Sequence, residues 1–318
     1  MRFRRKLGYL LATLAAAVSP AVAAPTCSLE NEAAEKLNLP IYEWSDPTVP
    51  NKGTIVAIHG LTFYAAAYDD FAKHLAEEGY RVYAADMRGF GRWKEECKKY
   101  GGDDKIHFTQ STEDVVKLLT FLHNRSGEKS ICLGESLGAN LALTVAAEHP
   151  DLVQSAIVSA PCVKTCVHPS PRWAIDFWKG LSNPSKPMNL EKYIEPYLSN
   201  NKELTKSCMA DKKICRSMSP VELIKADKTN KMAIAKIDSL PETMPLLVMA
   251  GKEDQVVKAS ALPKMVARLK TKDKTLHVIP KHGHLMIEHQ KVDNVVAEVI
   301  DTWLEQRQAP IVAVSERL

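Results

Sequence analysis

The sequence lacks long hydrophobic runs beyond its N-terminus. After residue 23 no stretch of 18 residues is apolar throughout, so we expect no membrane-spanning helix there. Internal repeats and low-complexity tracts are also missing, which excludes a repeat architecture. What remains is 318 residues of ordinary globular composition, 45% hydrophobic and 25% charged. This length suits one large α/β domain with an insertion, or two domains.

An excess of charge of one sign is missing too. The chain has 42 Lys and Arg against 38 Asp and Glu, a formal net charge of +4. Four of the basic residues lie in residues 1–23, which contain no acidic residue, so the remainder carries 38 charges of each sign. Without a basic stripe, the sequence predicts neither nucleic-acid binding nor electrostatic attraction to a membrane.

The N-terminal segment is typical of an export signal. "MRFRRK" is basic, "LGYLLATLAAAVS" is apolar, and "PAVA" ends in small residues at Ala21 and Ala23. We expect cleavage after Ala23 and a periplasmic or secreted protein; a retained membrane anchor is the alternative. Lipidation at Cys27 is disfavoured because Thr26 stands where a lipobox needs Gly or Ala.

The seven cysteines fit an exported protein. Cys132 lies in an apolar run and should be a small buried hydrophobe. The other six lie in polar or loop-like surroundings: Cys27, Cys97, Cys162, Cys166, Cys208 and Cys215. An oxidising compartment would let these six pair as disulfides. Cys162, Cys166 and His168 could instead hold a metal, but no second pair has zinc-like spacing, so we expect disulfides and no metal.

Strand-like apolar runs alternate with helix-like segments along most of the chain. The runs lie at 53–60, from 80, from 130, at 155–161, at 244–251 and at 274–280. Ser111 with Asp114 resembles a capping box at the head of one intervening helix. The alternation predicts an α/β fold with a mostly parallel sheet and helices on both faces.

The alternation stops between Cys162 and Pro241. This stretch has no strand-like run, and "PRWAIDFWKGL" and "MNLEKYIEPYL" both favour helices. Because structureless loops of this length are rare in compact domains, we predict a folded helical cap. The chain then divides into a signal peptide (1–23), a first core part (24–161), the cap segment (162–241) and a second core part (242–318).

Three aromatic residues of the cap segment fall close to one face of its first helix. They are Trp173, Phe177 and Trp178. This face either packs within the cap segment or forms a roof over the site and buries an acyl chain.

A serine stands between two glycines in "GESLG", where a strand-like run changes to a helix-like one. Such a junction forces Ser136 onto a strained turn that leaves its hydroxyl exposed, as a nucleophile requires. The five residues alone also fit a tightly packed turn, so the rest of the chain must supply a base, an acid and oxyanion donors.

The base and the acid have candidates at the carboxyl ends of later strands, where doubly wound sheets place their sites. His284 follows the last strand in "PKHGHLMIEH", with His282 and His289 as competitors. Asp254 follows the preceding strand in "MAGKEDQVV", with Glu253 as its rival.

Backbone N–H groups would bind the oxyanion. Leu137 follows the serine directly, and Leu61 lies in the first loop, "HGLT". His59, which precedes that loop, is expected to be structural.

Five segments carry a resemblance to a known family: "IHGLT", "ADMRGFGRW", "GESLGANLAL", "MAGKEDQVV" and "HGHLMIEH". In these segments, and in its order Ser, Asp, His, the chain resembles α/β-hydrolases of the monoacylglycerol lipase, lysophospholipase and serine-aminopeptidase-like group. The resemblance spans about residues 50–305, although the cap segment matches only in position and helical character. It implies the α/β-hydrolase fold, the triad Ser136, Asp254 and His284, and Leu61 and Leu137 as oxyanion donors. The export signal, the loop cysteines and a "HGLT" loop without the usual Gly-Glu-His continuation depart from the family.

The leading hypothesis is therefore a serine hydrolase of carboxylic esters that works through an acyl-enzyme without metal or cofactor. The expected substrate is a small ester or lipid of the monoacylglycerol or lysophospholipid type, which is compatible with transient contact with a membrane surface. Ser136 argues against a dehalogenase or epoxide hydrolase, which would need an aspartate there. A serine aminopeptidase is the first alternative and would need acidic residues such as Asp176, Glu191 and Glu195 to hold an amine. A non-catalytic binding protein is the second, and the oligomeric state is left open.

Overall fold

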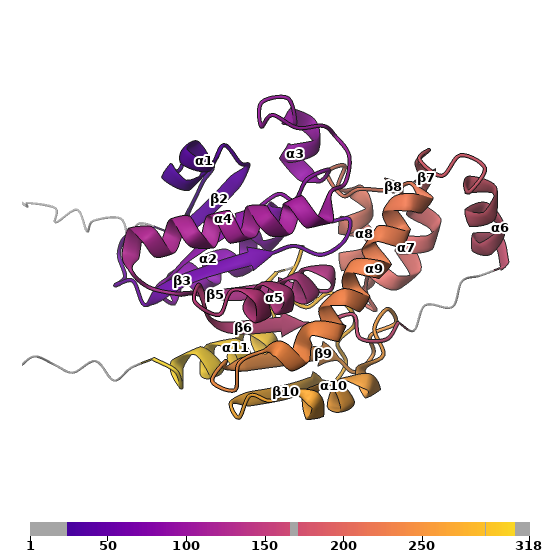
Figure 1. Cartoon of the computed structure of the whole chain (residues 1–318). Helices are drawn as coiled ribbons and strands as arrows, with labels where there is room; N and C mark the ends of the chain where they lie inside the picture. The colour runs from indigo at the N-terminus through magenta and orange to yellow at the C-terminus, as the bar shows by residue number, and fades with distance from the viewer. Residues whose placement is uncertain (1–23, 166–170, 290, 309–318) are drawn as a thin grey trace, which may run out of the picture.

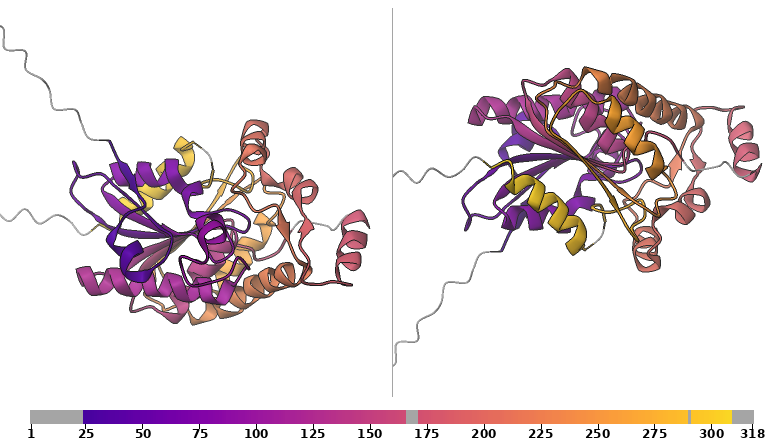
Figure 2. Two further views of the ribbon diagram at one scale, coloured as in Figure 1. Left: turned by 90° about the horizontal axis from the view of Figure 1, so that it is seen from above. Right: turned by 90° about the horizontal axis from the view of Figure 1, so that it is seen from below.

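The computed structural model describes residues 24–165, 171–289 and 291–308 (Figure 1). The predicted export signal, residues 1–23, lies outside the described residues, and so do Cys166 and His168 of the alternative metal site. The described chain forms a sheet of eight strands with helices on both faces (Figure 2).

The sheet is parallel except at one edge. Its order is β1-β2-β4-β3-β5-β6-β9-β10, and only the pairs β1–β2 and β2–β4 are antiparallel. In chain order the strands are β1 (Thr26–Ser28), β2 (Ile41–Ser45), β3 (Gly53–Ile58), β4 (Tyr80–Ala85), β5 (Ser130–Glu135), β6 (Val153–Ser159), β9 (Leu246–Gly251) and β10 (Lys274–Ile279). All six strands expected from the sequence are present, and the predicted α/β fold with a mostly parallel sheet and helices on both faces is confirmed. Because β3 and β5 are neighbouring parallel strands, the loops that follow them lie side by side at the carboxyl edge of the sheet.

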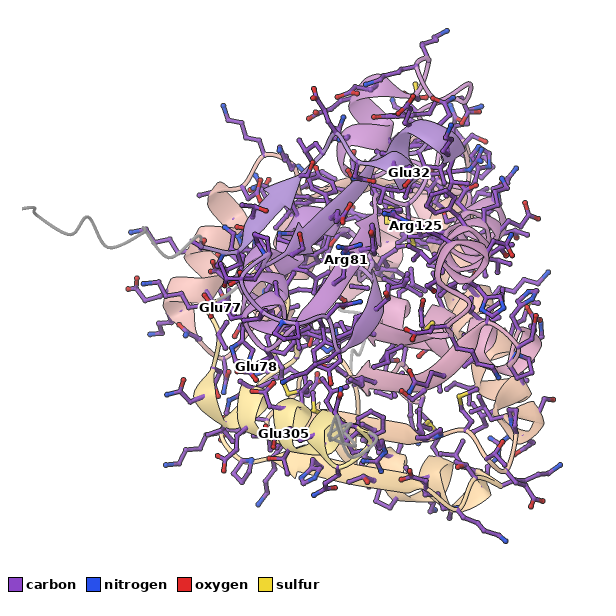
Figure 3. The ribbon with its side chains drawn as sticks, turned by 90° about the vertical axis from the view of Figure 1, so that its left-hand side faces the viewer. Glu32, Glu77, Glu78, Arg81, Arg125 and Glu305 are labelled. Atoms are coloured by element: carbon purple, nitrogen blue, oxygen red, sulfur yellow. The ribbon has the colours of Figure 1, made fainter. Side chains whose placement is uncertain are left out.

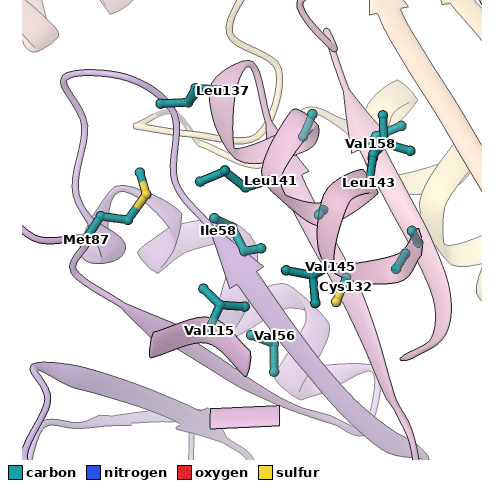
Figure 4. Close-up of a cluster of buried hydrophobic side chains, with 14 of the residues drawn as sticks. Val56, Ile58, Met87, Val115, Cys132, Leu137, Leu141, Leu143, Val145 and Val158 are labelled. Carbon is teal, nitrogen blue, oxygen red and sulfur yellow. The ribbon is translucent and has the colours of Figure 1, made fainter. Parts of the chain in front are cut away.

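Each face of the sheet buries its own apolar cluster. On one face α4 (Phe108–Ser126), α5 (Leu137–Glu148) and α10 (Leu262–Arg268) cover the strands. Figure 4 shows part of this cluster, where Leu141 and Val145 of α5 pack near Val56, Ile58 and Cys132. On the other face α2 (Asp69–Glu77) and α11 (Asn294–Glu305) cover the sheet. The apolar strand runs recognised in the sequence are thus buried on both faces, as expected for parallel strands.

Short helices complete the core at its N-terminal side. α1 (Glu32–Leu37) lies against α4, and Glu32 pairs with Arg125 at 3.0 Å, both labelled in Figure 3. α3 (Gly91–Glu96) follows β4. α4 starts at Phe108, so the predicted capping box at Ser111 is wrong: the Ser111 hydroxyl donates to the His107 carbonyl inside the first turn instead.

The cap segment is helical, as predicted. It contains α6 (Pro171–Gly180), β7 (Met188–Asn189), α7 (Glu191–Leu198), α8 (Lys202–Ala210), β8 (Ser217–Met218) and α9 (Pro220–Lys236), and a short 3₁₀ turn (Ile237–Ser239) follows. β7 and β8 pair as a separate small ribbon. α9 packs against α5, whereas α6 stands away from the rest of the molecule in Figures 1 and 2.

The six described cysteines are free thiols. The predicted disulfides are therefore not present among them; Cys27 lies on the edge strand β1, for example, and Cys208 inside α8. Cys132 is buried and apolar, as expected. Within the described ranges, no helix has the length and apolar character to cross a membrane, and no group of His, Cys, Asp and Glu could hold a metal ion.

Candidate active site

Ser136 occupies the turn between β5 and α5. Its backbone angles, φ 56° and ψ −120°, lie outside the regions that L-residues normally adopt. Its N–H donates to the carbonyl of Ser159 at 2.9 Å, which fixes the turn against β6. The turn therefore has the strained strand-to-helix geometry that the sequence predicts, at the carboxyl edge of the sheet.

The two flanking glycines allow α5 to pack directly against the sheet. A Cβ atom at Gly138 would lie 1.8 Å from the carbonyl oxygen of Ile58, and one at Gly134 would lie 2.4 Å from the carbonyl carbon of Gly138. Both distances are far shorter than any real contact, so only glycine fits these positions.

His284 lies between Ser136 and Asp254. Its Nε2 is 2.9 Å from the Ser136 Oγ, and its Nδ1 is 2.9 Å from Asp254 Oδ2. The second oxygen, Oδ1, accepts the N–H groups of Val256 and Val257 at 2.7 and 2.9 Å, which holds the carboxylate in place. Because a carboxylate only accepts, Nδ1 must carry the proton and Nε2 is free to accept from the serine hydroxyl.

The rival acid and the first rival base point elsewhere. Glu253 accepts from the side-chain amide of Asn200 at 2.9 Å. His282 lies 3.2 Å from Asp293 through its Nε2, and its Nδ1 is 2.9 Å from a backbone carbonyl. Neither side chain is hydrogen-bonded to Ser136 or to His284.

The remaining histidine candidates are also engaged in other contacts. His289 lies 3.6 Å from Asp211 and 3.3 Å from the Ser207 hydroxyl. His59 accepts the N–H of Met87 at 3.0 Å, and burial lowers its pKa to about 4. A neutral, fully enclosed imidazole agrees with the structural role expected for His59.

The predicted oxyanion donors border the serine. Leu61 follows β3 and Leu137 is the first residue of α5, and both line the same pocket as Ser136. The first N–H groups of a helix have no intrahelical acceptor. In the described part of the chain the N–H of Leu61 also has no acceptor, so both N–H groups are available to a ligand.

A pocket of about 250 Å³ opens beside Ser136 and His284. Its apolar wall consists mainly of residues from α7 and the loop after β3: Leu61, Phe63, Tyr193, Ile194, Tyr197, Leu198, Val256 and Leu285. Such a lining suits an apolar group attached to a carbonyl that reaches the serine.

The aromatic residues of α6 do not line this pocket. Trp178 is 72% exposed, and Trp173 stacks on Phe177 with ring centroids 4.9 Å apart. Of the two alternatives for this face, the roof over the site is therefore not seen in this structure; the next helix, α7, supplies the wall instead.

Two contacts join the cap segment to the loop after β3. The N–H of Cys215 donates to the carbonyl of Thr62 at 2.8 Å, and the Tyr64 hydroxyl donates to Asp211 at 2.5 Å. Phe63, between them, is buried in a cluster with residues of α7 and α8. The cap segment therefore constrains the loop that contains Leu61.

The sequence interpretation gave three residues near the serine no part in the catalytic site, and it considered Cys162 only for a disulfide or a metal site. Cys162 follows β6 and places its sulfur beside Ser136, and the carboxyl groups of Glu135 and Glu288 lie buried beneath the site. Glu135 was visible as the second residue of "GESLG", where a buried charge is unusual. No comparable signal marked Cys162 or Glu288.

Comparison with known proteins identifies the family and the fold. Residues 49–291 match the family model for serine aminopeptidases, S33. The monoacylglycerol lipase of Mycolicibacterium smegmatis is 23% identical over 83% of this chain and 92% of its own, and the human monoglyceride lipase is 25% identical over 83% and 86%. The crystal structure of Paleococcus ferrophilus monoacylglycerol lipase superposes with a TM-score of 0.66 at 22% identity, covering 84% of this chain and 98% of the other.

Proposed function

Since the chain belongs to the serine aminopeptidase S33 family, we propose that it is a serine hydrolase of the monoacylglycerol lipase type. Its substrates are carboxylic esters with lipid-like acyl chains, such as monoacylglycerols or lysophospholipids. One observation carries the proposal: His284 bridges Ser136 and Asp254 at 2.9 Å on each side, beside an apolar pocket.

In the acylation step, His284 acts as the general base. Its Nε2 takes the proton of the Ser136 hydroxyl as the oxygen attacks the ester carbonyl. The carbonyl oxygen becomes an oxyanion that the N–H groups of Leu61 and Leu137 bind. The imidazolium then gives its proton to the leaving alcohol, and the acyl group remains on Ser136.

In the deacylation step, water takes the place of the alcohol. His284 removes a proton from the water, which attacks the acyl carbonyl, and the same proton returns to the Ser136 oxygen as the acid leaves. Asp254 holds the imidazole in the required tautomer and stabilises its positive charge through both steps. No step needs a metal or a cofactor.

The pocket lining favours esters over peptides with a free N-terminus. An aminopeptidase needs an ionised acid for the substrate's ammonium group, yet none of the three acidic candidates lines the pocket. Asp176 accepts from Tyr193 and Lys192, Glu191 lies near Arg216, and Glu195 is exposed.

A substrate panel tests the proposal. Purified protein is assayed with p-nitrophenyl esters from acetate to dodecanoate and with aminoacyl p-nitroanilides, and Ser136→Ala serves as the matched inactive control. We expect turnover of the esters, none of the anilides, and no ester turnover in the variant. Faster turnover of the anilides would establish the aminopeptidase instead, and no turnover of either class would favour a binding protein.

We further propose that the protein is exported. The support is the sequence of residues 1–23, with its basic, apolar and small-residue sections in order. Periplasmic or secreted location would give the enzyme access to lipid esters outside the cytoplasm.

A further inference from the structure

Glu288 lies in the loop that begins with His284, and its side chain reaches the loop that contains the oxyanion donor Leu61. Its side chain is fully buried, and its Oε1 accepts the N–H of Gly60 at 2.7 Å. Its Oε2 has no hydrogen-bond partner among the described residues, and the residue lines the same pocket as Ser136. A buried polar atom without a partner is costly, so its presence beside a reaction site calls for a reason.

The carboxyl group packs closely against Gly60, where a Cβ atom would crowd it. A Cβ atom at Gly60 would lie 2.9 Å from Glu288 Oε2, 3.3 Å from the Glu135 carbonyl oxygen and 3.5 Å from the Ser136 Cβ. Gly60 is therefore enclosed between the serine turn and Glu288. Any displacement of this glycine moves the neighbouring peptide, which carries the N–H of Leu61.

Glu135 lies next to Glu288 and has far more donors. It accepts the Ser159 hydroxyl at 2.6 Å and the N–H groups of Met286, Glu288 and Ile287 at 2.9, 3.0 and 3.4 Å. These bonds fix the loop that begins with His284. Several hydrogen bonds donated to one carboxylate stabilise its ionised form.

Two neighbouring carboxyl groups in a buried site do not both ionise. Glu135 has four donors. Glu288 has only the Gly60 N–H, because the nearby Tyr68 hydroxyl donates to the Ile58 carbonyl at 2.9 Å instead, so the shared proton belongs to Glu288. Burial, and then the charge of Glu135, raises the pKa of Glu288 well above its usual range. Burial raises the pKa of Glu135 as well, but its donors and the positive charge that His284 can carry oppose that effect.

No cation among the described residues neutralises Glu288. Tyr68 and Cys208 face it from the neighbouring elements, and burial raises the pKa of the first well above its usual range and of the second to about 12, so both are neutral at pH 7. The Tyr68 hydroxyl donates to the Ile58 carbonyl, which leaves its oxygen free to accept. His289, the next residue along the chain, lies near Asp211 instead.

We propose that Glu288 is a positioning residue for the oxyanion hole, which fixes the Gly60–Leu61 peptide while remaining a neutral carboxylic acid. This inference rests on the proposed function. A neutral acid accepts the Gly60 N–H without adding a negative charge beside the oxyanion that forms on the substrate. An ionised Glu288 would hold the same loop but would repel that oxyanion.

Three variants separate this role from simple packing. Glu288→Gln keeps an uncharged acceptor for Gly60, and we expect a kcat for a p-nitrophenyl ester within about threefold of wild type. Glu288→Met has similar volume but no strong acceptor; its kcat should fall roughly tenfold to a hundredfold, less than the loss of a whole oxyanion donor, with little change in KM. Ile287→Val is the matched control, a buried apolar neighbour whose variant should lose stability but not kcat.

The pH profile gives a second and independent readout. Wild-type kcat should decline on the alkaline side as Glu288 ionises, and Glu288→Gln should lack that decline. A kcat in folded Glu288→Met equal to wild type would overturn the inference, as would equal losses in the Gln and Met variants. If Glu288→Met does not fold, an unchanged alkaline limb in Glu288→Gln overturns it. A wild-type protein without esterase activity would instead refute the proposed function.

Discussion

The sulfur of Cys162 lies 3.6 Å from the Oγ of Ser136. The serine donates its own proton to His284 in the arrangement proposed, so the thiol is the donor in this contact. The Cys162 N–H donates to the side-chain oxygen of Asn140 at 2.9 Å, which fixes its backbone. The thiol therefore forms part of the pocket wall directly beside the nucleophile.

This contact predicts slow, pH-dependent inactivation by a maleimide. Burial raises the pKa of Cys162 to about 11, so little thiolate exists at neutral pH and the rate should rise about tenfold per pH unit up to that pKa. An adduct would fill the pocket and block the ester. Cys162→Ala should keep kcat within about fivefold, since a thiol is a weak donor, and should resist inactivation. Inactivation of that variant at the wild-type rate would locate the sensitive thiol elsewhere.

The proposed triad predicts graded losses of ester turnover. Ser136→Ala and His284→Ala should each reduce kcat by at least about a thousandfold, because the members act as a unit. Asp254→Asn should lose somewhat less, since the imidazole is still present in the wrong tautomer. His282→Ala is the matched control and should keep wild-type kcat. If His282→Ala loses activity and His284→Ala keeps it, the assigned base is wrong.

The export proposal predicts the N-terminus of the mature protein. Expressed with its own first 23 residues in a bacterial host, the protein should appear outside the cytoplasm and begin at Ala24. Fractionation followed by mass spectrometry of the intact chain measures both. A full-length chain in the membrane fraction would support the retained anchor, and a full-length cytoplasmic chain would contradict export altogether.

The parallel core and the positions of the site loops were predictable because buried strands leave continuous apolar runs. The antiparallel strands β1 and β2 were missed, since runs of only three and five residues carry little periodic signal. The disulfide prediction was wrong for the described cysteines. Composition indicates whether a compartment permits pairing, but it does not show which Cα atoms approach closely enough to form a disulfide.

Side-chain contacts between distant segments were beyond the sequence. Helical spacing correctly placed Trp173 and Phe177 near one another, but it could not say whether that face meets the pocket or solvent. Glu288 was overlooked for the same reason, since its partner Gly60 is 228 residues away. The burial of Glu288 is recognisable only once the loop that contains Gly60 and the loop that contains Glu288 are both in place.

The protonation of Glu288 also predicts how stability changes with pH. Its folded pKa is raised above the ordinary value of 4.5, so the folded protein binds a proton that the unfolded chain releases. The stabilising contribution of Glu288 to the free energy of unfolding is therefore fully present below about pH 4.5 and is lost as the pH rises through the folded pKa. We expect the free energy of unfolding of wild type, relative to Glu288→Gln, to decrease over that range. Urea titrations of both proteins at several pH values measure it, and a constant difference would contradict a protonated Glu288.

The wall of α7 predicts the acyl-chain preference. Each methylene buried in the pocket should contribute about 0.8 kcal/mol, which is about fourfold in kcat/KM, until the pocket is filled. Ile194→Ala and Tyr197→Ala remove apolar surface from that wall, so the rise from acetyl to longer esters should flatten while acetyl ester turnover is retained. Trp178→Ala, on the exposed face of α6, is the matched control and should leave the profile unchanged. If the α7 variants keep the wild-type profile and Trp178→Ala changes it, α6 rather than α7 contacts the acyl chain during turnover, and the cap segment must rearrange to bring it there.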